Sequence, residues 1–247
     1  MWKAFADYHT HTVYSHGGGT IRDNAKKAKE RGLEELGIAD HGPANWGHIA
    51  TTGLDAFEKI IKETQEVQRE FSGLKVLAAT EANLISFQGD LDIPLGMQKK
   101  LDMVLAGFHT TIYPKSFEDG FQFASQRVLS FVSPDIKRKA RAANTKAMVE
   151  AVYKNEIDII THPGLKISID THELARACVR NNTALEINSK HGIKSIEFIK
   201  AAAREGVKFA IGSDAHQPER VGQLEAGIKS AQMAGLNVDQ LMNVREI

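Results

Sequence analysis

Short apolar runs alternate with longer amphipathic stretches along the whole 247-residue chain. The short runs are almost continuous in apolar residues, which is typical of parallel strands buried on both faces. We therefore expect strands at about residues 5–8, 36–39, 76–79, 103–106, 157–160, 184–187 and 209–211.

Helical periodicity fills the stretches between these runs. The clearest case places Phe57, Ile60, Thr64 and Val67 at three- and four-residue intervals, along one face of a helix. Further helices are expected at about 21–31, 142–154, 171–181, 195–205 and 218–234. Strands that alternate with helices in this way predict an α/β fold, either a closed parallel barrel or an open doubly wound sheet.

The placement of polar residues distinguishes these two folds. A histidine or a carboxylate follows the apolar run of six of the predicted strands: His9, His41, Glu81, His109, His162 and Asp214. In a closed barrel all strand ends converge on one face, whereas an open sheet spreads them along a row too wide for them to meet. The pattern therefore predicts a seven-stranded TIM-like barrel.

The chain shows no internal linker, so we expect one domain over residues 1–247. The stretch from about 110 to 141 interrupts the alternation, and connections of that length are uncommon in compact domains. Phe117, Phe121 and Phe131 make it too apolar for a disordered loop. We expect a lid-like insertion with a short helix of its own.

Composition narrows the class of protein. Apolar residues make up 42% and charged residues 25%, as in ordinary globular proteins. Thirty-one basic and 31 acidic residues cancel, so no net field attracts nucleic acid or an anionic membrane. No signal peptide or membrane span is visible, and the single Cys178 suits a reducing compartment. We expect a cytoplasmic protein without nucleic-acid or membrane partners, and its oligomeric state stays open.

Seven of the ten histidines lie in short motifs after predicted strands, together with one glutamate and one aspartate. Imidazoles and carboxylates are ligands of zinc, manganese and iron. The candidate ligands are His9, His11, His16, His41, Glu81, His109, His162, Asp214 and His216. They are too many for one ion, because a catalytic zinc usually takes three protein ligands and keeps an open position. A multinuclear metal hydrolase is the first hypothesis.

Single histidines are weak evidence for a metal, so the prediction depends on recurrence. His9 and His11 lie on the same side of an extended segment, because strand side chains repeat every two residues. Glu81 ends an apolar run, where a carboxylate is costly unless it is paired or bound to a metal. We assign no ligand role to the remaining histidines, His48, His172 and His191.

These motifs together resemble the PHP (polymerase and histidinol phosphatase) family over essentially the whole chain. They read His9-Thr10-His11, Asp40-His41-Gly42, Glu81-Ala82-Asn83, Gly107-Phe108-His109, Thr161-His162-Pro163-Gly164 and Ser213-Asp214-Ala215-His216. The segments 38–43 and 184–188 are most similar to YcdX-like bacterial phosphatases. The resemblance implies a distorted (β/α)7 barrel that binds three divalent metal ions, with zinc expected first and manganese or iron as alternatives.

The resemblance also implies how the ligands divide. The first metal would bind His9, His11, Glu81 and Asp214, the second Glu81, His109 and His162, and the third His16, His41 and His216. The implied reaction is hydrolysis of a phosphomonoester of a small metabolite through a metal-activated hydroxide.

Other polar residues are assigned supporting roles. Asp40 and Asn83, beside ligands, are expected to orient imidazoles or water. Lys190, Arg138 and Arg141 are candidate contacts to the substrate phosphate. For the two arginines, a solvated helix start on the insertion is the alternative.

Several alternative functions stay open at this point. Histidinol-phosphate hydrolysis is the nearest within the family. A nucleic-acid phosphodiesterase or exonuclease is less favoured, because the chain has no net positive charge. A non-catalytic metal-binding module would need closed, four-ligand sites. An amidohydrolase is a further alternative, since such barrels also gather His and Asp at strand ends.

Overall fold

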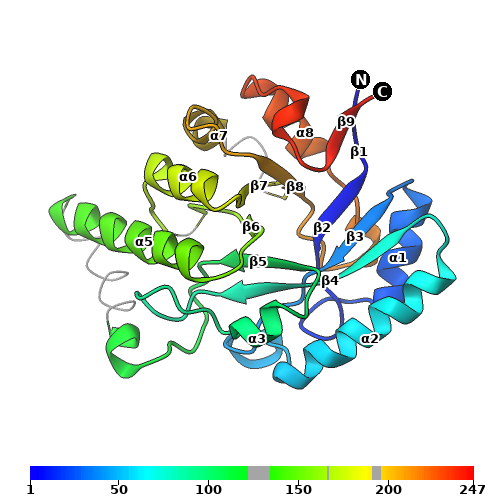
Figure 1. The fold of residues 1–247 in the computed structure, drawn as a ribbon, viewed down its shortest axis with the longest axis horizontal. Helices are drawn as coiled ribbons and strands as arrows, with labels where there is room; N and C mark the ends of the chain where they lie inside the picture. The colour runs from blue at the N-terminus through cyan, green and yellow to red at the C-terminus, as the bar shows by residue number, and fades with distance from the viewer. Residues whose placement is uncertain (122–133, 166, 191–195) are drawn as a thin grey trace.

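The computed structural model describes residues 1–121, 134–165, 167–190 and 196–247. One sheet of seven parallel strands follows the order of the chain (Figure 1). Its strands are β2 (Ala6–Thr10), β3 (Glu35–Ile38), β4 (Lys75–Asn83), β5 (Met103–Gly107), β6 (Ile159–Ile160), β7 (Ala184–Asn188) and β8 (Phe209–Gly212). Past the strand ends, the His11 amide donates to the Ala215 carbonyl over 2.8 Å, which brings β2 against β8. The predicted seven-stranded barrel is confirmed and is nearly closed.

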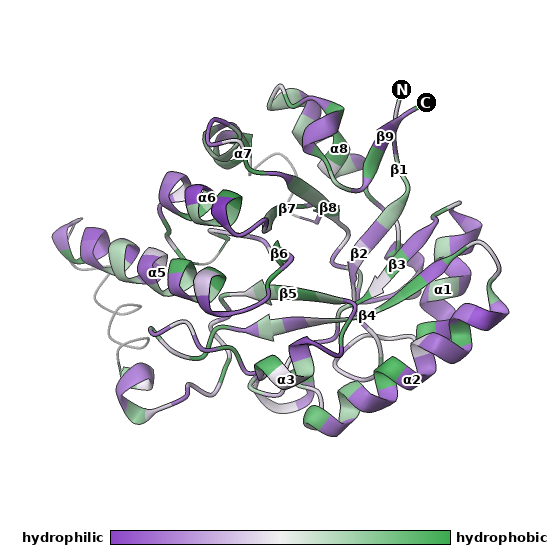
Figure 2. Ribbon diagram, viewed as in Figure 1, coloured by the Kyte–Doolittle hydropathy of each residue, from purple (hydrophilic) through white to green (hydrophobic). Residues whose placement is uncertain are grey.

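Helices surround the sheet. They are α1 (Ile21–Glu30), α2 (Leu54–Glu70), α3 (Leu95–Gln98), α5 (Pro134–Lys154), α6 (Thr171–Arg180), α7 (Ile196–Ala203) and α8 (Glu225–Met233), with 3-10 turns η1 (Gly47–Ile49), η3 (Pro218–Arg220) and η4 (Val238–Gln240). On α2, Phe57, Ile60 and Val67 are buried, as the sequence periodicity predicts. Figure 2 shows that strands such as β5, β7 and β8 are hydrophobic, whereas the helices carry both hydrophobic and hydrophilic residues.

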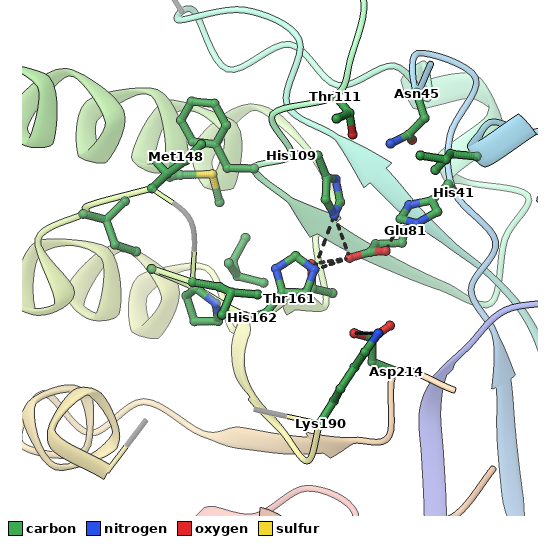
Figure 3. A pocket seen from close by; sticks show the side chains of 18 of the residues that line it. His41, Asn45, Glu81, His109, Thr111, Met148, Thr161, His162, Lys190 and Asp214 are labelled. Carbon is green, nitrogen blue, oxygen red and sulfur yellow. Dashed lines mark hydrogen bonds and ion pairs between the residues drawn. The ribbon is translucent and has the colours of Figure 1, made fainter. Parts of the chain in front are cut away.

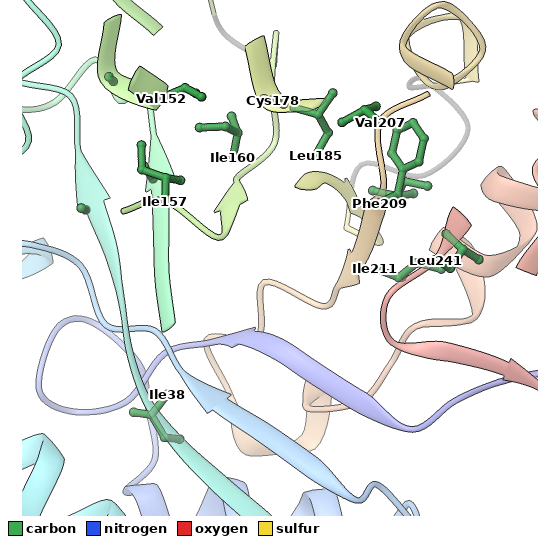
Figure 4. Packing of buried hydrophobic residues seen from close by; sticks show 14 of the residues in the cluster. Ile38, Val152, Ile157, Ile160, Cys178, Leu185, Val207, Phe209, Ile211 and Leu241 are labelled. Carbon is green, nitrogen blue, oxygen red and sulfur yellow. The ribbon is translucent and has the colours of Figure 1, made fainter. Parts of the chain in front are cut away.

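The apolar core has two parts on opposite faces of the sheet. Leu185, Phe209 and Ile211 are fully buried in the larger cluster, which also contains buried helix residues (Figure 4). Ala79 and Leu105 belong to a smaller cluster that fills the barrel interior. The strands are therefore buried on both faces, which explains why their sequences show continuous apolar runs.

A bulge in β2 decides where the first histidine motif points. The pairing of β2 with β3 shifts between Asp7 and Thr10. Tyr8 packs in the interior cluster, and His9 also points inward, toward Glu81 and Glu186 of other strands. Two consecutive inward side chains are possible only because the bulge changes the alternation. Gly37 of β3 leaves room for it, since a Cβ there would lie 2.5 Å from the Tyr8 carbonyl oxygen.

The two ends of the chain form a small second sheet. β1 (Trp2–Ala4) pairs antiparallel with β9 (Val244–Glu246). Just before β9, the buried Asn243 amide donates to the carbonyls of Ala6 and Ile211, both over 2.8 Å. This side chain therefore bridges β2 and β8. The sequence analysis missed the pair, because each strand has three residues and its partner lies at the other end of the chain.

Several predicted boundaries are wrong. A single helix over 218–234 does not form: the chain turns at Gly222, whose φ is +74° and whose amide donates to Asp7 Oδ2 over 2.8 Å, and α8 begins at Glu225. β4 continues to Asn83, because hydrogen-bond partners satisfy the buried side chains of Thr80, Glu81 and Asn83 beyond its apolar run. Helix α5 begins at Pro134 rather than at about 142.

The insertion predicted at about 110–141 is described in part. At its start, Ile112 forms a β-bridge with Asn45, and its last residues belong to α5. Residues 117–121 are helical, and residues 122–133 of the expected lid lie outside the described residues. Within the described part of the chain, the helices are too short or too polar to cross a membrane.

Candidate metal centre

The predicted ligands lie together in one cluster at the carboxyl ends of the strands. Figure 3 shows five of them: His41, Glu81, His109, His162 and Asp214. Ring centroids are 4.4 Å apart for His11 and His216, 4.3 Å for His16 and His216, and 5.1 Å for His109 and His162. These residues come from segments up to 205 positions apart, so the barrel rather than the local sequence concentrates them.

Glu81 lies at the middle of the cluster. Its Oε2 atom is 3.3 Å from His9 Nε2 and 3.1 Å from His41 Nδ1. Its Oε1 atom is 3.2 Å from His109 Nε2 and 2.8 Å from His162 Nε2. Burial raises the pKa of this carboxyl, but the surrounding imidazoles outweigh burial and hold it well below its usual range. The two oxygens of one ionised carboxylate thus face two different groups of histidines.

Asp214 supplies a second carboxylate to the cluster. Its Oδ1 atom is 3.6 Å from His11 Nε2 and 4.0 Å from His9 Nε2. The φ angle of Asp214 is +53°, and that of His162 is +28°. Two non-glycine residues in this region of backbone space indicate strain at the cluster, as is common at functional sites.

Three sets of nitrogen and oxygen ligands lie close enough to share an ion, with all ligand atoms of a set within 4.8 Å of one another. These sets are His9, His11 and Asp214; His41, Glu81 and His109; and His11, His41 and His216. The first contains three of the four residues expected for the first site, without Glu81, and the second contains His41 where the resemblance implies His162. The third contains His11 where the resemblance implies His16, although the His16 ring stacks on His41 with centroids 5.0 Å apart.

The protonation state of two of the imidazoles suits binding of divalent metals. Burial lowers the pKa of His11 to about 3 and that of His16 to about 4, so both are neutral at pH 7. The Nδ1 atoms of both rings are buried and have no hydrogen-bond partner among the described residues. Neutral imidazoles with unsatisfied nitrogens, beside ionised carboxylates, are the donor set that zinc, manganese and iron prefer.

Asn83 orients the imidazole of His109, as predicted. Its amide nitrogen donates to Asn45 Oδ1 and Asp92 Oδ2, both over 2.6 Å, which leaves its carbonyl oxygen toward His109. His109 Nδ1 donates to that oxygen over 2.7 Å, so Nε2 is free to face Glu81. Asp40 acts differently from expectation, because its hydrogen-bond partners among the described residues include no imidazole. It accepts from Thr12 and Ser15 and so holds the loop that carries His16.

Glu186 is the residue that the sequence analysis missed. It is 3% exposed, lies on β7, and accepts from His9 Nδ1 and from the His162 amide, both over 2.7 Å. Gly212 leaves space for it, since a Cβ there would be 2.1 Å from Glu186 Oε1. A glutamate within the apolar run 184–187 could have indicated this role, by the same argument as for Glu81.

Of the three predicted substrate contacts, one lies at the cavity and two lie away from it. Lys190 lines the cavity, and its Nζ is 3.4 Å from Asp214 Oδ2. Arg138 pairs with Asp135 on the exposed side of α5, and Arg141 donates to Asp170 over 2.8 Å. Neither arginine is among the described residues that line the cavity, so the solvated helix start is the better interpretation of their cluster.

The histidines without an assigned ligand role do not line the cavity where they are described. His172 Nδ1 donates to Glu205 Oε1 over 2.7 Å on the surface, and His48 belongs to η1, whose Ile49 lines the cavity. His191 lies outside the described residues. Burial raises the pKa of the Cys178 thiol to about 12, so this side chain is a small buried hydrophobe, as expected.

A cavity of about 340 Å³ opens beside the cluster. It is bordered by ligands from both sides of Glu81, among them His16, His41, His109, His162, Asp214 and His216. The cluster is therefore accessible to a small molecule, unlike a closed structural metal site.

Several known proteins are similar to this chain in sequence or in fold. Residues 7–193 match the PHP domain family. The chain is 33% identical to a protein named probable phosphatase from Thermoanaerobacter sp. (strain X514), over 98% of this chain and 91% of that protein. A protein of that name from Shewanella frigidimarina (strain NCIMB 400) is 30% identical over 98% of this chain and 89% of its own length.

Among solved structures, the similar ones include histidinol phosphate phosphatase from Lactococcus lactis subsp. lactis Il1403, complexed with zinc, L-histidinol and phosphate. Its TM-score is 0.62 at 18% identity, and the alignment covers 95% of both chains. At this identity, the likeness shows a shared fold.

Proposed function

Because this chain belongs to the PHP domain family, we propose that it is a metal-dependent phosphoesterase that hydrolyses a phosphomonoester of a small metabolite. The observation that carries the proposal is Glu81, which directs one oxygen to His9 and His41 and the other to His109 and His162, beside an open cavity. This arrangement suits a carboxylate that bridges two cations.

We propose three divalent ions, with zinc first and manganese or iron as alternatives. Their ligands would be His9, His11, Glu81 and Asp214 for one, Glu81, His109 and His162 for another, and His16, His41 and His216 for the third. Bound divalent cations supply Lewis acidity, which neutralises phosphoryl charge and lowers the pKa of water. The donor set supports this proposal, and His11 stands near enough to the third group to contribute there as well.

The protein itself would position these ligands and the substrate. Asn83 and Glu186 hold His109 and His9 with Nε2 toward the cluster. Lys190 places a positive charge at the cavity wall, where it would attract a phosphate that approaches the metals. The single Cys178 is buried and does not line the cavity, so no thiol takes part in the proposed reaction. The cytosol stays the location that we expect.

Two observations bear on the alternatives. The cavity of about 340 Å³ is suited to a small ester rather than a polynucleotide. Its opening onto the ligands favours catalysis over a metal-stabilised structural module. Histidinol phosphate stays in the substrate screen because of the Lactococcus lactis structure.

The test combines metal analysis with an activity assay. Elemental analysis of the purified protein should give about three ions per chain. Hydrolysis of p-nitrophenyl phosphate should be lost on chelation and return with zinc or manganese. The Glu81→Gln variant should lose both metal and activity. One metal or none per chain, with no hydrolysis after reloading, would reject the proposal.

A further inference from the structure

The cavity beside the ligands has two chemically different walls. One wall consists of the histidines and carboxylates of the cluster, with Lys190. The other contains the apolar side chains of Phe108, Met148, Leu165, Ile167 and Ile169, and the uncharged polar residues Asn45, Thr111 and Thr161 complete the lining. Figure 3 shows Met148 across the pocket from His41 and Asn45. A substrate bound to the ligands would therefore extend its remaining atoms toward a hydrocarbon surface.

The apolar wall is part of the packed structure. Met148 comes from α5 and is 3% exposed, and Ile169, just before α6, is 9% exposed. α5 and α6 pack against each other, and Arg141 of α5 donates to the Ile169 carbonyl over 3.1 Å. Met148 and Ile169 are thus held in place where α5 packs against α6, while Leu165 and Ile167 come from the loop that leads to α6. The buried part of the wall is a preformed surface for a ligand.

Among the described residues, the charged side chains that line the cavity lie on the other wall. Among the described residues that line the cavity, Lys190 is the one with a permanent positive charge, and Glu81 and Asp214 are the carboxylates. All three lie on the side of the cluster. The described apolar wall offers no partner to a second phosphate, a carboxylate or an ammonium group, and burying such a charge without a partner is costly.

We propose that the organic part of the substrate is a small, uncharged alkyl or aryl alcohol whose carbon skeleton packs against Met148, Ile167 and Ile169. This inference rests on the proposed function, because it concerns the leaving group of the same phosphomonoester. The cavity volume of about 340 Å³ limits that group to a few carbons or one ring, since ligand pockets run from about 300 to 1,000 Å³.

A homologous series of substrates tests the inference with the metal-loaded enzyme. In methyl, ethyl, propyl and butyl phosphate, the acidity of the alcohol changes little while the apolar area grows. We expect kcat/KM to rise about fourfold per methylene, the ratio that corresponds to about 0.8 kcal/mol for a buried CH₂ group. 4-Aminobutyl phosphate, with an ammonium group at its end, should lose this gain. A flat series, or a preference for the amine, would overturn the inference.

Matched variants locate the effect on the wall. Met148→Ala should reduce the ratio of butyl to methyl phosphate hydrolysis by about tenfold. Val152→Ala also truncates a buried side chain of α5, one turn further along and outside the cavity, and should leave this ratio unchanged. Equal ratios in Met148→Ala and the wild type would reject the assignment of the wall. If Met148→Ala does not fold, the substrate series on the wild type still decides.

The two proposals fail in different ways. If the metal-loaded protein hydrolyses neither p-nitrophenyl phosphate nor any alkyl phosphate, the proposed function is wrong. If it hydrolyses p-nitrophenyl phosphate and methyl phosphate but does not distinguish chain lengths, the phosphatase assignment stands and the apolar leaving group is wrong.

Discussion

Glu186→Gln is the substitution that tests most directly how the barrel prepares its ligands. The native carboxylate is buried and accepts from His9 Nδ1 and the His162 amide, both over 2.7 Å, and from Asn188 Nδ2 over 3.2 Å. Glutamine keeps the shape but has one acceptor oxygen, and its amide nitrogen donates. One of the two short hydrogen bonds must therefore be lost or reversed.

Either orientation of the new side chain is unfavourable. If its nitrogen faces His9 Nδ1, the ring must carry its proton on Nε2, which is the atom that faces Glu81 and His11. If its nitrogen faces the His162 amide, two donors oppose each other in a buried place, at a cost of about 1–3 kcal/mol. Loss of such an outer partner typically lowers metal affinity by about 10- to 100-fold, or about 1.4–2.7 kcal/mol.

The assay is a zinc titration of chelated, metal-free protein against a chromophoric competitor, with circular dichroism to verify the fold. We expect Glu186→Gln to bind at least one ion about 10- to 100-fold more weakly. Glu205→Gln is the matched control, because Glu205 also contacts a histidine Nδ1 over 2.7 Å, at His172 on the surface. Unchanged affinity in a folded Glu186→Gln protein would refute the reasoning and leave Glu186 a packing residue.

Three further predictions concern stability and can be measured by urea unfolding. Asn243→Ala removes the buried bridge between β2 and β8 and should lower the free energy of unfolding by about 3 kcal/mol; a loss below about 1 kcal/mol would contradict the bridging role. Gly37→Ala places a Cβ 2.5 Å from a β2 carbonyl oxygen and should destabilise the fold by at least about 1 kcal/mol while weakening metal binding through the bulge; wild-type behaviour would show that the bulge yields freely. Asp90 has a lowered pKa because hydrogen bonds from Lys115 and Lys154 outweigh the opposing effect of burial. Its carboxylate therefore stabilises the fold above its unfolded pKa of about 3.9, and this contribution is lost as the pH falls through the lowered folded value. Asp90→Asn should cost about 1 kcal/mol at pH 7, and the difference from the wild type should shrink below pH 4; a constant difference would argue against the ion pairs.

Much of the fold could be predicted from the sequence alone, for a definite physical reason. Strands of a parallel barrel are buried on both faces, so the run 103–106 is apolar throughout, the run 184–187 is apolar except for Glu186, and both are easy to recognise. Boundaries were less accurate where polar side chains continue a strand, as in β4, or where one glycine ends a helix, as at Gly222. The pairing of β1 with β9 escaped prediction, because no local pattern specifies a partner at the far end of the chain.

The candidate site shows the same division. The sequence determined which residues converge, because a barrel brings all its strand ends to one face and His9, Glu81 and Asp214 each follow an apolar run. Only the tertiary structure decided how they face each other. The bulge that directs His9 inward, the hydrogen bonds of Glu186, and the position of Arg138 away from the cavity all depend on contacts between segments far apart in the chain. Periodicity records burial along one segment, whereas the orientation of a side chain in a shared site depends on the packing of all the segments around it.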